Sequence, residues 1–307
     1  MSSPALSRPH AATSSHGIVL VLLAAMLWGT TGTANSFAPE GLSPYWVGAL
    51  RLGFAAAFFA VLALVAERGR RTAATAMDWP RLLLCALCMV AYNLLFFAAL
   101  HTTGVGLGTA AAIGSSPIWA GMLQALLQRQ WPQPLWWAGT AIGVAGGLVM
   151  ALANPSGHPA SWQGLVMCLL AGLAYGCYAV LSQPLVRRCG VSRVNVGVFA
   201  LAALVALPLA WVVSGSAPHT SAQGWAVVAY LGLVATGVAY LLFSLGLRSV
   251  SAATSVALSK VEPITAFVLS IVLVGERAST PAVLGLVLVL GGLWLVVHSE
   301  LRSPRTA

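Results

Sequence analysis

The sequence predicts an all-α integral membrane protein: ten transmembrane helices, arranged as two inverted five-helix repeats around a central cavity. Three observations predict this fold. The 307 residues are 59% hydrophobic and 7% charged, whereas a soluble domain usually carries about 25% charged residues to cover its surface. The apolar residues form ten runs, each close to the ~20 residues that cross a bilayer. Certain residues of the first five runs recur in the last five at a nearly constant offset.

The repeat is visible in tryptophan, proline and glycine positions. Trp28-Gly29 is matched by Tyr175-Gly176, 147 residues later. At an offset of 146 residues, the later positions are also matched: Pro117 by Pro263, Gly139 by Gly285 and Gly146 by Gly292. Two such halves commonly enclose a binding site near the membrane midplane, so the pattern is more typical of solute transport than of bond chemistry.

Each helix is placed on an apolar run between breaking residues. The expected helices span 17–38, 44–66, 80–100, 104–127, 134–152, 161–185, 193–214, 223–246, 250–274 and 280–298. Proline and glycine mark most of the joins, and the ends carry an uncertainty of ~2–4 residues. The first run is too long for a signal-peptide core, and nine more follow it, so we expect it to be retained.

The positive charges set the expected orientation. With the N-terminus in the cytoplasm, the cytoplasmic side holds twelve of the loop and tail arginines, and the opposite side holds only Arg277. We therefore expect a multi-pass protein of the bacterial inner membrane with both termini cytoplasmic, including a disordered tail at 1–16 and a second cytoplasmic tail at 299–307. Five spans per half make the repeats inverted, which is an arrangement that supports alternating access. The net charge is +9, but the basic residues lie mainly in short loops and tails and not in a basic domain. No nucleic-acid partner is therefore expected.

Three ionisable residues lie inside the expected spans: Arg51, Lys260 and Glu262. A charge at the centre of a membrane helix costs on the order of 2.5–3.5 kcal/mol on insertion scales, so such residues usually face a cavity or a partner. Lys260 lies ~15 Å into its helix, near the bilayer middle. Its ammonium either meets an anionic group of a substrate, or it is structural: neutral, or paired with Glu262 or a helix carbonyl.

Arg51 and Glu262 lie at matching depths, ~10–12 Å from the periplasmic face. We expect them to be neighbours or to share a network, since a bidentate Arg–Glu pair would satisfy both charges. If Glu262 is instead unpaired in the cavity, it becomes a candidate proton carrier.

Two prolines interrupt the expected spans at matching positions of the two halves. Pro117 and Pro263 each remove a backbone donor in mid-helix, and Pro263 frees a carbonyl near Ser259. A backbone carbonyl freed by a proline can bind a cationic ligand, or the proline can allow a gating bend. Alternatively, each proline is only a kink that neighbouring helices pack against. His101, at the periplasmic end of its helix, is either a gating residue or a solvated turn histidine.

Aromatic and polar side chains recur at the same depths. They suit the wall of a pocket for a small zwitterion with an apolar side chain, although membrane aromatics often simply pack. The candidate cavity residues of this kind are Trp28, Tyr92, Asn93, Ser116, Trp119, Tyr175, Tyr178 and Tyr240. No metal site or cofactor is expected, because Cys85-x-x-Cys88 lies in an apolar helix without a second pair. The glycines at 139, 143 and 147, with 285, 291 and 292, predict that the fifth and last helices pack together or across a homodimer.

Several short motifs carry a resemblance to a known family. They are Leu27-Trp28-Gly29, Arg51-Leu52-Gly53-Phe54, Ser115-Ser116-Pro117-Ile118, Ala174-Tyr175-Gly176, Val261-Glu262-Pro263-Ile264 and Gly275-Glu276-Arg277. The chain resembles the drug/metabolite transporter superfamily, in particular its EamA-type members with two repeats of five helices. The resemblance covers residues 17–298 and implies EamA-like repeats at 17–152 and 161–298.

The resemblance implies a secondary transporter that exports amino acids or related metabolites. The alternatives are a multidrug or other metabolite transporter of the same fold and, from a different class, an intramembrane enzyme. Ser115 and Ser116 are the candidate nucleophiles of an intramembrane enzyme, but no histidine lies at matching depth to act as a base, which favours a transporter. No Walker A pattern is present, so we do not expect ATP to drive transport directly.

Overall fold

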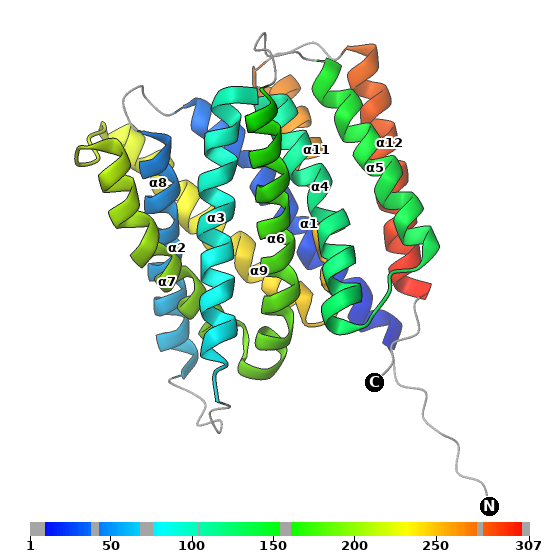
Figure 1. Ribbon diagram of the computed structural model, residues 1–307, viewed down its shortest axis with the longest axis horizontal. Helices are drawn as coiled ribbons and strands as arrows, with labels where there is room; N and C mark the ends of the chain where they lie inside the picture. The colour runs from blue at the N-terminus through cyan, green and yellow to red at the C-terminus, as the bar shows by residue number, and fades with distance from the viewer. Residues whose placement is uncertain are drawn as a thin grey trace, which may run out of the picture.

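The computed structural model describes residues 10–37, 43–67, 76–103, 105–153, 161–274 and 279–302. Within this part of the chain the regular structure is entirely helical, and ten spans are long and apolar enough to cross a membrane. The helices run side by side. The N-terminal end of α1 (His10–Ser36) and the C-terminal end of α12 (Thr280–Arg302) both lie at the lower end of the bundle in Figure 1.

The first half contains α1 (His10–Ser36), α2 (Pro44–Glu67), α3 (Trp79–Thr103), α4 (Val105–Gln128) and α5 (Pro134–Ala153). The second half opens with α6 (Trp162–Cys189) and α7 (Val191–Ser214). The next span is α8 (Ala222–Gly232), the π-helix η1 (Leu233–Val238) and α9 (Ala239–Leu247). The ninth span is α10 (Ala252–Leu258), α11 (Val261–Leu269) and the π-helix η2 (Ser270–Val274), and α12 (Thr280–Arg302) is the last. All ten expected helices are therefore present.

Three helix ends differ from expectation by four residues or more. The first helix begins at His10 instead of residue 17, the sixth continues to Cys189 instead of residue 185, and the last continues to Arg302 instead of residue 298. Each extension contains polar or charged residues and adjoins an apolar run. Hydropathy alone does not find them, because a helix continues beyond the apolar stretch wherever its backbone hydrogen bonds continue.

The ninth span was expected as one helix but is interrupted at Ser259 and Lys260. The cause is Pro263, which has no N–H to donate to the carbonyl four residues earlier, that of Ser259. The Glu262 N–H donates to the Ser259 carbonyl in its place, at 2.9 Å. The carbonyl that we expected to be free is thus occupied. Pro117, the matching proline of the first half, lies inside a continuous α4.

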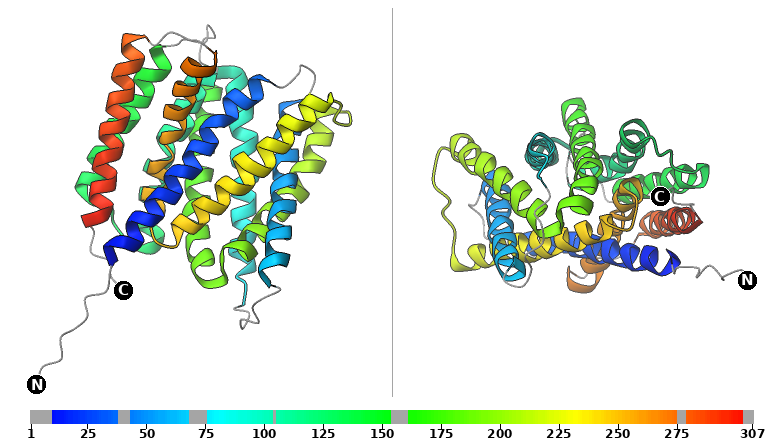
Figure 2. Two further views of the ribbon diagram at one scale, coloured as in Figure 1. Left: turned by 180° about the vertical axis from the view of Figure 1, so that it is seen from behind. Right: turned by 90° about the horizontal axis from the view of Figure 1, so that it is seen from below.

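The helices pair in a regular way. α3 packs on α6, α2 on α7, and α1 against both α9 and α11. α1 and the α8–α9 span cross the same face of the bundle, as Figure 2 shows from behind. The main core of buried side chains lies where α1, α3, α6, α7 and α9 meet, while large apolar residues such as Leu126, Val212 and Trp294 are exposed on the outside.

α5 and α12 form a pair at one side of the bundle (Figure 1). A Cβ added at Gly139 would lie 2.7 Å from the Gly292 carbonyl oxygen, and one added at Gly146 would lie 2.7 Å from that of Gly285. The two backbones therefore touch. This confirms, for the two helices of one chain, the contact that the glycine spacing predicts. Gly147 and Gly291, which the prediction included, do not take part, because a Cβ there would meet nothing within 4 Å.

Candidate functional site

A cluster of aromatic rings lies at the centre of the bundle. The Trp28 ring of α1 is 6.0 Å from that of Tyr175 on α6, 5.1 Å from that of Tyr240 and 5.4 Å from that of Phe243, both on α9. Tyr92 of α3 lies 5.4 Å from Tyr175. These five residues, here called the central aromatic cluster, bring together four helices from both halves of the chain.

The cluster contains buried polar atoms without a hydrogen-bond partner in the part of the chain that the structure describes. They are Nε1 of Trp28 and the hydroxyl of Tyr175, and the hydroxyl of the adjoining Tyr178 is a third. Trp28, Tyr175 and Tyr178 are 7%, 6% and 1% exposed. The hydroxyls of Tyr175 and Ser259 lie near each other without forming a hydrogen bond. Because buried donors are normally satisfied, such atoms indicate a place for water or a ligand.

Two ionisable groups of opposite sign lie near this cluster. The Arg51 guanidinium and the Glu262 carboxyl group are within electrostatic range of each other and of the hydroxyls of Tyr92 and Tyr240. Both side chains are partly exposed, and the structure contains no direct ion pair between them. The expected proximity of Arg51 and Glu262 is therefore present, without the bidentate contact.

Arg51 is held by an irregular segment of the eighth span. Its Nε donates to Oγ1 of Thr236 at 3.0 Å, and Thr236 donates in turn to the Leu231 carbonyl at 2.7 Å. Thr236 belongs to the π-helix η1, a type of insertion that is frequent at functional sites. Sequence reasoning missed Thr236 because a π-helix has no short sequence signal.

Lys260 occupies a different environment. Its Nζ donates to the Thr140 carbonyl of α5 at 2.9 Å, and the residue is 4% exposed. A Cβ added at Gly143 would lie 3.1 Å from Nζ, so the absence of a side chain there makes room for the ammonium. In this conformation Lys260 thus makes a structural contact of the kind expected as one alternative, and its role in substrate binding stays a prediction.

The remaining predicted residues lie around the cluster. Asn93 and Ser116 are buried and donate to carbonyls of their own helices, those of Met89 at 2.9 Å and Ala112 at 2.6 Å. Trp119 has an unpartnered Nε1. A Cβ at Gly176 would lie 3.2 Å from the Ser116 carbonyl oxygen, so α4 and α6 are in close contact here. The side chain of His101 lies outside the described residues.

The lower end of the bundle is held together by hydrogen bonds. Gln183 of α6 donates to the carbonyls of Leu247 and Val250 at 3.1 and 2.7 Å. Gln124 of α4 accepts from the Ala253 N–H at 2.9 Å, and Glu300 of α12 accepts from Ser251 at 2.9 Å. The turn between α9 and α10 is thereby fixed to three other helices.

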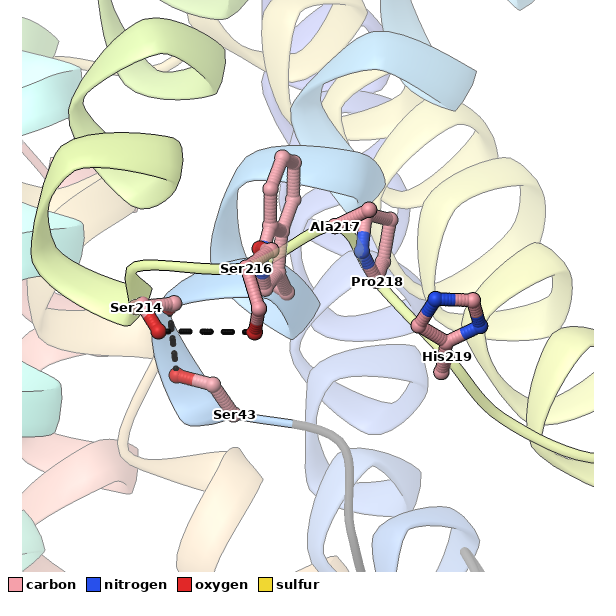
Figure 3. Close-up of a pocket in the computed structure, with 7 residues that line it drawn as sticks. Ser43, Ser214, Ser216, Ala217, Pro218 and His219 are labelled. Carbon is pink, nitrogen blue, oxygen red and sulfur yellow. Dashed lines mark hydrogen bonds between the residues drawn. The ribbon is translucent and has the colours of Figure 1, made fainter.

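The opposite end contains a pocket of about 460 Å³. It is lined by Ser43, Trp46, Ser214, Ser216, Ala217, Pro218 and His219 (Figure 3). Ser214 Oγ donates to Ser43 Oγ at 3.0 Å, and Trp46 Nε1 donates to the Ser216 carbonyl at 2.9 Å. These two hydrogen bonds join the start of α2 to the end of α7 and the loop after it, on either side of the pocket.

The candidate site contains groups whose chemistry suits a solute: a guanidinium for an anion, a carboxylate for a cation, and aromatic faces for an apolar group. Among the described residues no group of three or more histidine, cysteine or acidic side chains is placed to hold a metal ion. Ten apolar spans with these groups in their interior define a multi-pass membrane protein of the transporter class.

Comparison with known proteins identifies the family. The EamA-like transporter family matches residues 15–152 and again residues 162–298. The chain belongs to this family. A solved crystal structure has a TM-score of 0.80 with 20% identity, covering 94% of this chain and 99% of that one, which shows that the fold is shared.

Three relatives are similar to this chain. An uncharacterized transporter of Bacillus subtilis, YwfM, is 36% identical over 94% of this chain and 96% of its own length. A probable terminal-alkyne amino-acid exporter of Streptantibioticus cattleyicolor is 27% identical over 87% of this chain and 89% of its own. The biotin transporter of Salmonella typhimurium is 25% identical over 48% of this chain and 50% of its own.

Proposed function

We propose that this protein is a secondary transporter that exports small organic solutes, amino acids or related metabolites, across the bacterial inner membrane by alternating access. The observation that carries the proposal is the central aromatic cluster with Arg51 and Glu262 beside it: charged and hydrogen-bonding groups inside an apolar bundle, where they are costly unless they serve a ligand. The proposed binding residues are Trp28, Tyr92, Tyr175, Tyr240, Arg51 and Glu262.

Reciprocal contacts between the halves support an inverted repeat. Trp28 and Tyr175, which match each other at an offset of 147 residues, are also in contact. Gly139 touches Gly292 while Gly146 touches Gly285, so matching residues exchange partners. A pseudo-twofold axis in the membrane plane produces this exchange, in the same way that a true twofold axis produces an isologous interface.

Contacts of α1 and α6 repeat the pattern. A Cβ at Gly29 would lie 2.6 Å from the Glu262 carbonyl oxygen, and one at Gly176 would lie 3.2 Å from that of Ser116. Gly29 matches Gly176, and Glu262 stands 146 residues after Ser116. The equivalent helices α1 and α6 run in opposite directions in Figure 1, as inversion requires.

Relatives and loop charges support direction and substrate class. One relative is named as a probable amino-acid exporter and another as a biotin transporter, so the test includes both types of substrate. The arginine distribution favours cytoplasmic termini. The pocket around Ser43 and Ser214 would then open toward the periplasm, while the hydrogen-bonded end would close the cytoplasmic side.

The test is transport by the purified protein in liposomes. We expect uptake of at least one labelled amino acid among L-phenylalanine, L-leucine and L-threonine, measured with and without a pH gradient, and labelled biotin is tested beside them. Trp28→Ala should abolish uptake, whereas Trp162→Ala, at a position 76% exposed, should not. The recovered label should be chemically unchanged. Uptake of none of the amino acids, or conversion of the label, would contradict the proposal.

A further inference from the structure

We propose that Arg51 and Glu262 bind the two ends of one zwitterion: the guanidinium takes the α-carboxylate and the Glu262 carboxylate takes the α-ammonium. The side chain of the same solute would lie on the central aromatic cluster. This inference rests on the proposed function and deepens it, because it assigns the substrate class and the orientation of the solute. A bound zwitterion would bridge the two halves of the chain, since Arg51 belongs to the first and Glu262 to the second.

The first argument is the relation between the two charges. They interact electrostatically, yet no ion pair joins them. A structural Arg–Glu pair in a membrane protein gains most from direct, bidentate contact, because isolation of either charge there is costly. Arg51 instead donates through Nε to Thr236 at 3.0 Å, a neutral partner that fixes the direction of the guanidinium. Among the described residues, no carboxylate forms an ion pair with the Arg51 guanidinium.

The second argument is the position of Glu262. Its backbone is fixed twice: its N–H donates to the Ser259 carbonyl at 2.9 Å, and its own carbonyl lies against Gly29 of α1. Its side chain makes no hydrogen bond or ion pair within the described residues, and it is partly exposed. A rigid backbone with an unpaired carboxylate is the geometry of a preformed cation site.

The third argument is the set of unpartnered donors beside these charges. Trp28 Nε1 and the Tyr175 hydroxyl are buried and unsatisfied. The Glu262 carboxylate lies within electrostatic range of the Tyr175 hydroxyl. The carboxylate of a bound solute would find two free donors here, Trp28 Nε1 and the Tyr175 hydroxyl. The aromatic faces add attraction for an ammonium and surface for an apolar side chain.

Lys260, the other buried cation, is a poorer candidate for the carboxylate. It lies at the interruption between α10 and α11, outside the helix that carries Glu262. Its ammonium contacts α5 at the Thr140 carbonyl, away from the aromatic cluster. The guanidinium also presents a planar fork that matches a carboxylate better than an ammonium does.

The experiment measures ligand-induced thermal stabilisation of purified protein, because this readout requires binding but no turnover. The probes are the amino acid that wild-type protein transports best and its two single-charge analogues. For L-phenylalanine these are 2-phenylethylamine, which lacks the carboxylate, and 3-phenylpropanoate, which lacks the ammonium. The variants are Arg51→Gln and Glu262→Gln. Arg81→Gln is the control, since Arg81 pairs with Asp78 at the surface.

We expect opposite losses in the two variants. Arg51→Gln should weaken phenylalanine and 3-phenylpropanoate by about tenfold or more, as expected for a lost charge-assisted contact, and leave 2-phenylethylamine unchanged. Glu262→Gln should weaken phenylalanine and 2-phenylethylamine and leave 3-phenylpropanoate unchanged. Arg81→Gln should behave as wild type with all three probes.

Any other pattern overturns the inference. Equal weakening of both analogues in both variants would mean that the charges support the fold, and no weakening would mean that they do not contact the solute. Failure of the transported amino acid to stabilise wild-type protein would also count against it. The proposed function fails separately, if liposomes containing wild-type protein take up no amino acid at all.

Discussion

At the residue scale, Lys260 presents the clearest choice between structure and binding. Its ammonium is sealed against the Thr140 carbonyl at 2.9 Å, in a space that Gly143 leaves open. The other buried-span cation, Arg51, is held elsewhere, because its Nε donates to Thr236 Oγ1 at 3.0 Å. The conformation therefore assigns Lys260 to the junction of α10, α11 and α5.

Two substitutions separate the alternatives. We expect Lys260→Ala to lose about 1–3 kcal/mol of stability, since it removes both the hydrogen bond and the packing of a buried side chain. Lys260→Met should stay close to wild type in stability and in amino-acid transport, because an apolar residue of similar volume often replaces a buried ion without loss. Thermal denaturation and liposome uptake check this. A stable but inactive Lys260→Met would instead place Lys260 in contact with the solute during the cycle.

At the element scale, the contact of α5 with α12 depends on glycine. A Cβ at Gly146 would lie 2.7 Å from the Gly285 carbonyl oxygen, and one at Gly292 would lie 2.5 Å from that of Gly139. Backbone atoms cannot move aside as a side chain can, so even alanine must push the helices apart.

We expect Gly146→Ala and Gly292→Ala each to cost about 1–3 kcal/mol, the usual effect of overpacking. The neighbouring glycines provide matched controls, because a Cβ at Gly147 or Gly291 would meet nothing within 4 Å. Gly147→Ala and Gly291→Ala should be neutral or stabilise by up to about 1 kcal/mol, as alanine favours a helix. Melting temperatures in detergent measure all four; equal losses in all four would show that the glycines do not act through this contact.

Sequence predicted those features that depend on position along a helix. The lengths of the apolar runs predicted the ten spans, and the glycine spacing predicted the α5–α12 contact. The positions of Arg51 and Glu262 along their helices predicted that the two residues lie near each other. Direction around the helix and local distortion were not predictable. Lys260 turns toward α5, and Arg51 binds Thr236 in a π-helix; both depend on tertiary contacts that no short stretch of sequence contains.

At the scale of the whole molecule, the two ends of the bundle are built differently. The turn between α9 and α10 is bonded to α4, α6 and α12, whereas the start of α2 and the loop after α7 meet around a pocket of about 460 Å³. Alternating access requires the second end to open and close in each cycle. The Ser43–Ser214 contact, with hydroxyl oxygens 3.0 Å apart, spans it.

A reversible crosslink at this contact tests the movement. Cysteines in a Ser43→Cys/Ser214→Cys double variant are placed to form a disulfide between α2 and the end of α7. If this end moves during transport, oxidation should stop amino-acid uptake and a reductant should restore it. The single variants, and oxidised wild-type protein with its own five cysteines, should transport normally under both conditions. Full uptake by the crosslinked protein, with the disulfide verified by mass spectrometry, would mean that this end stays fixed and that the solute enters and leaves by another route.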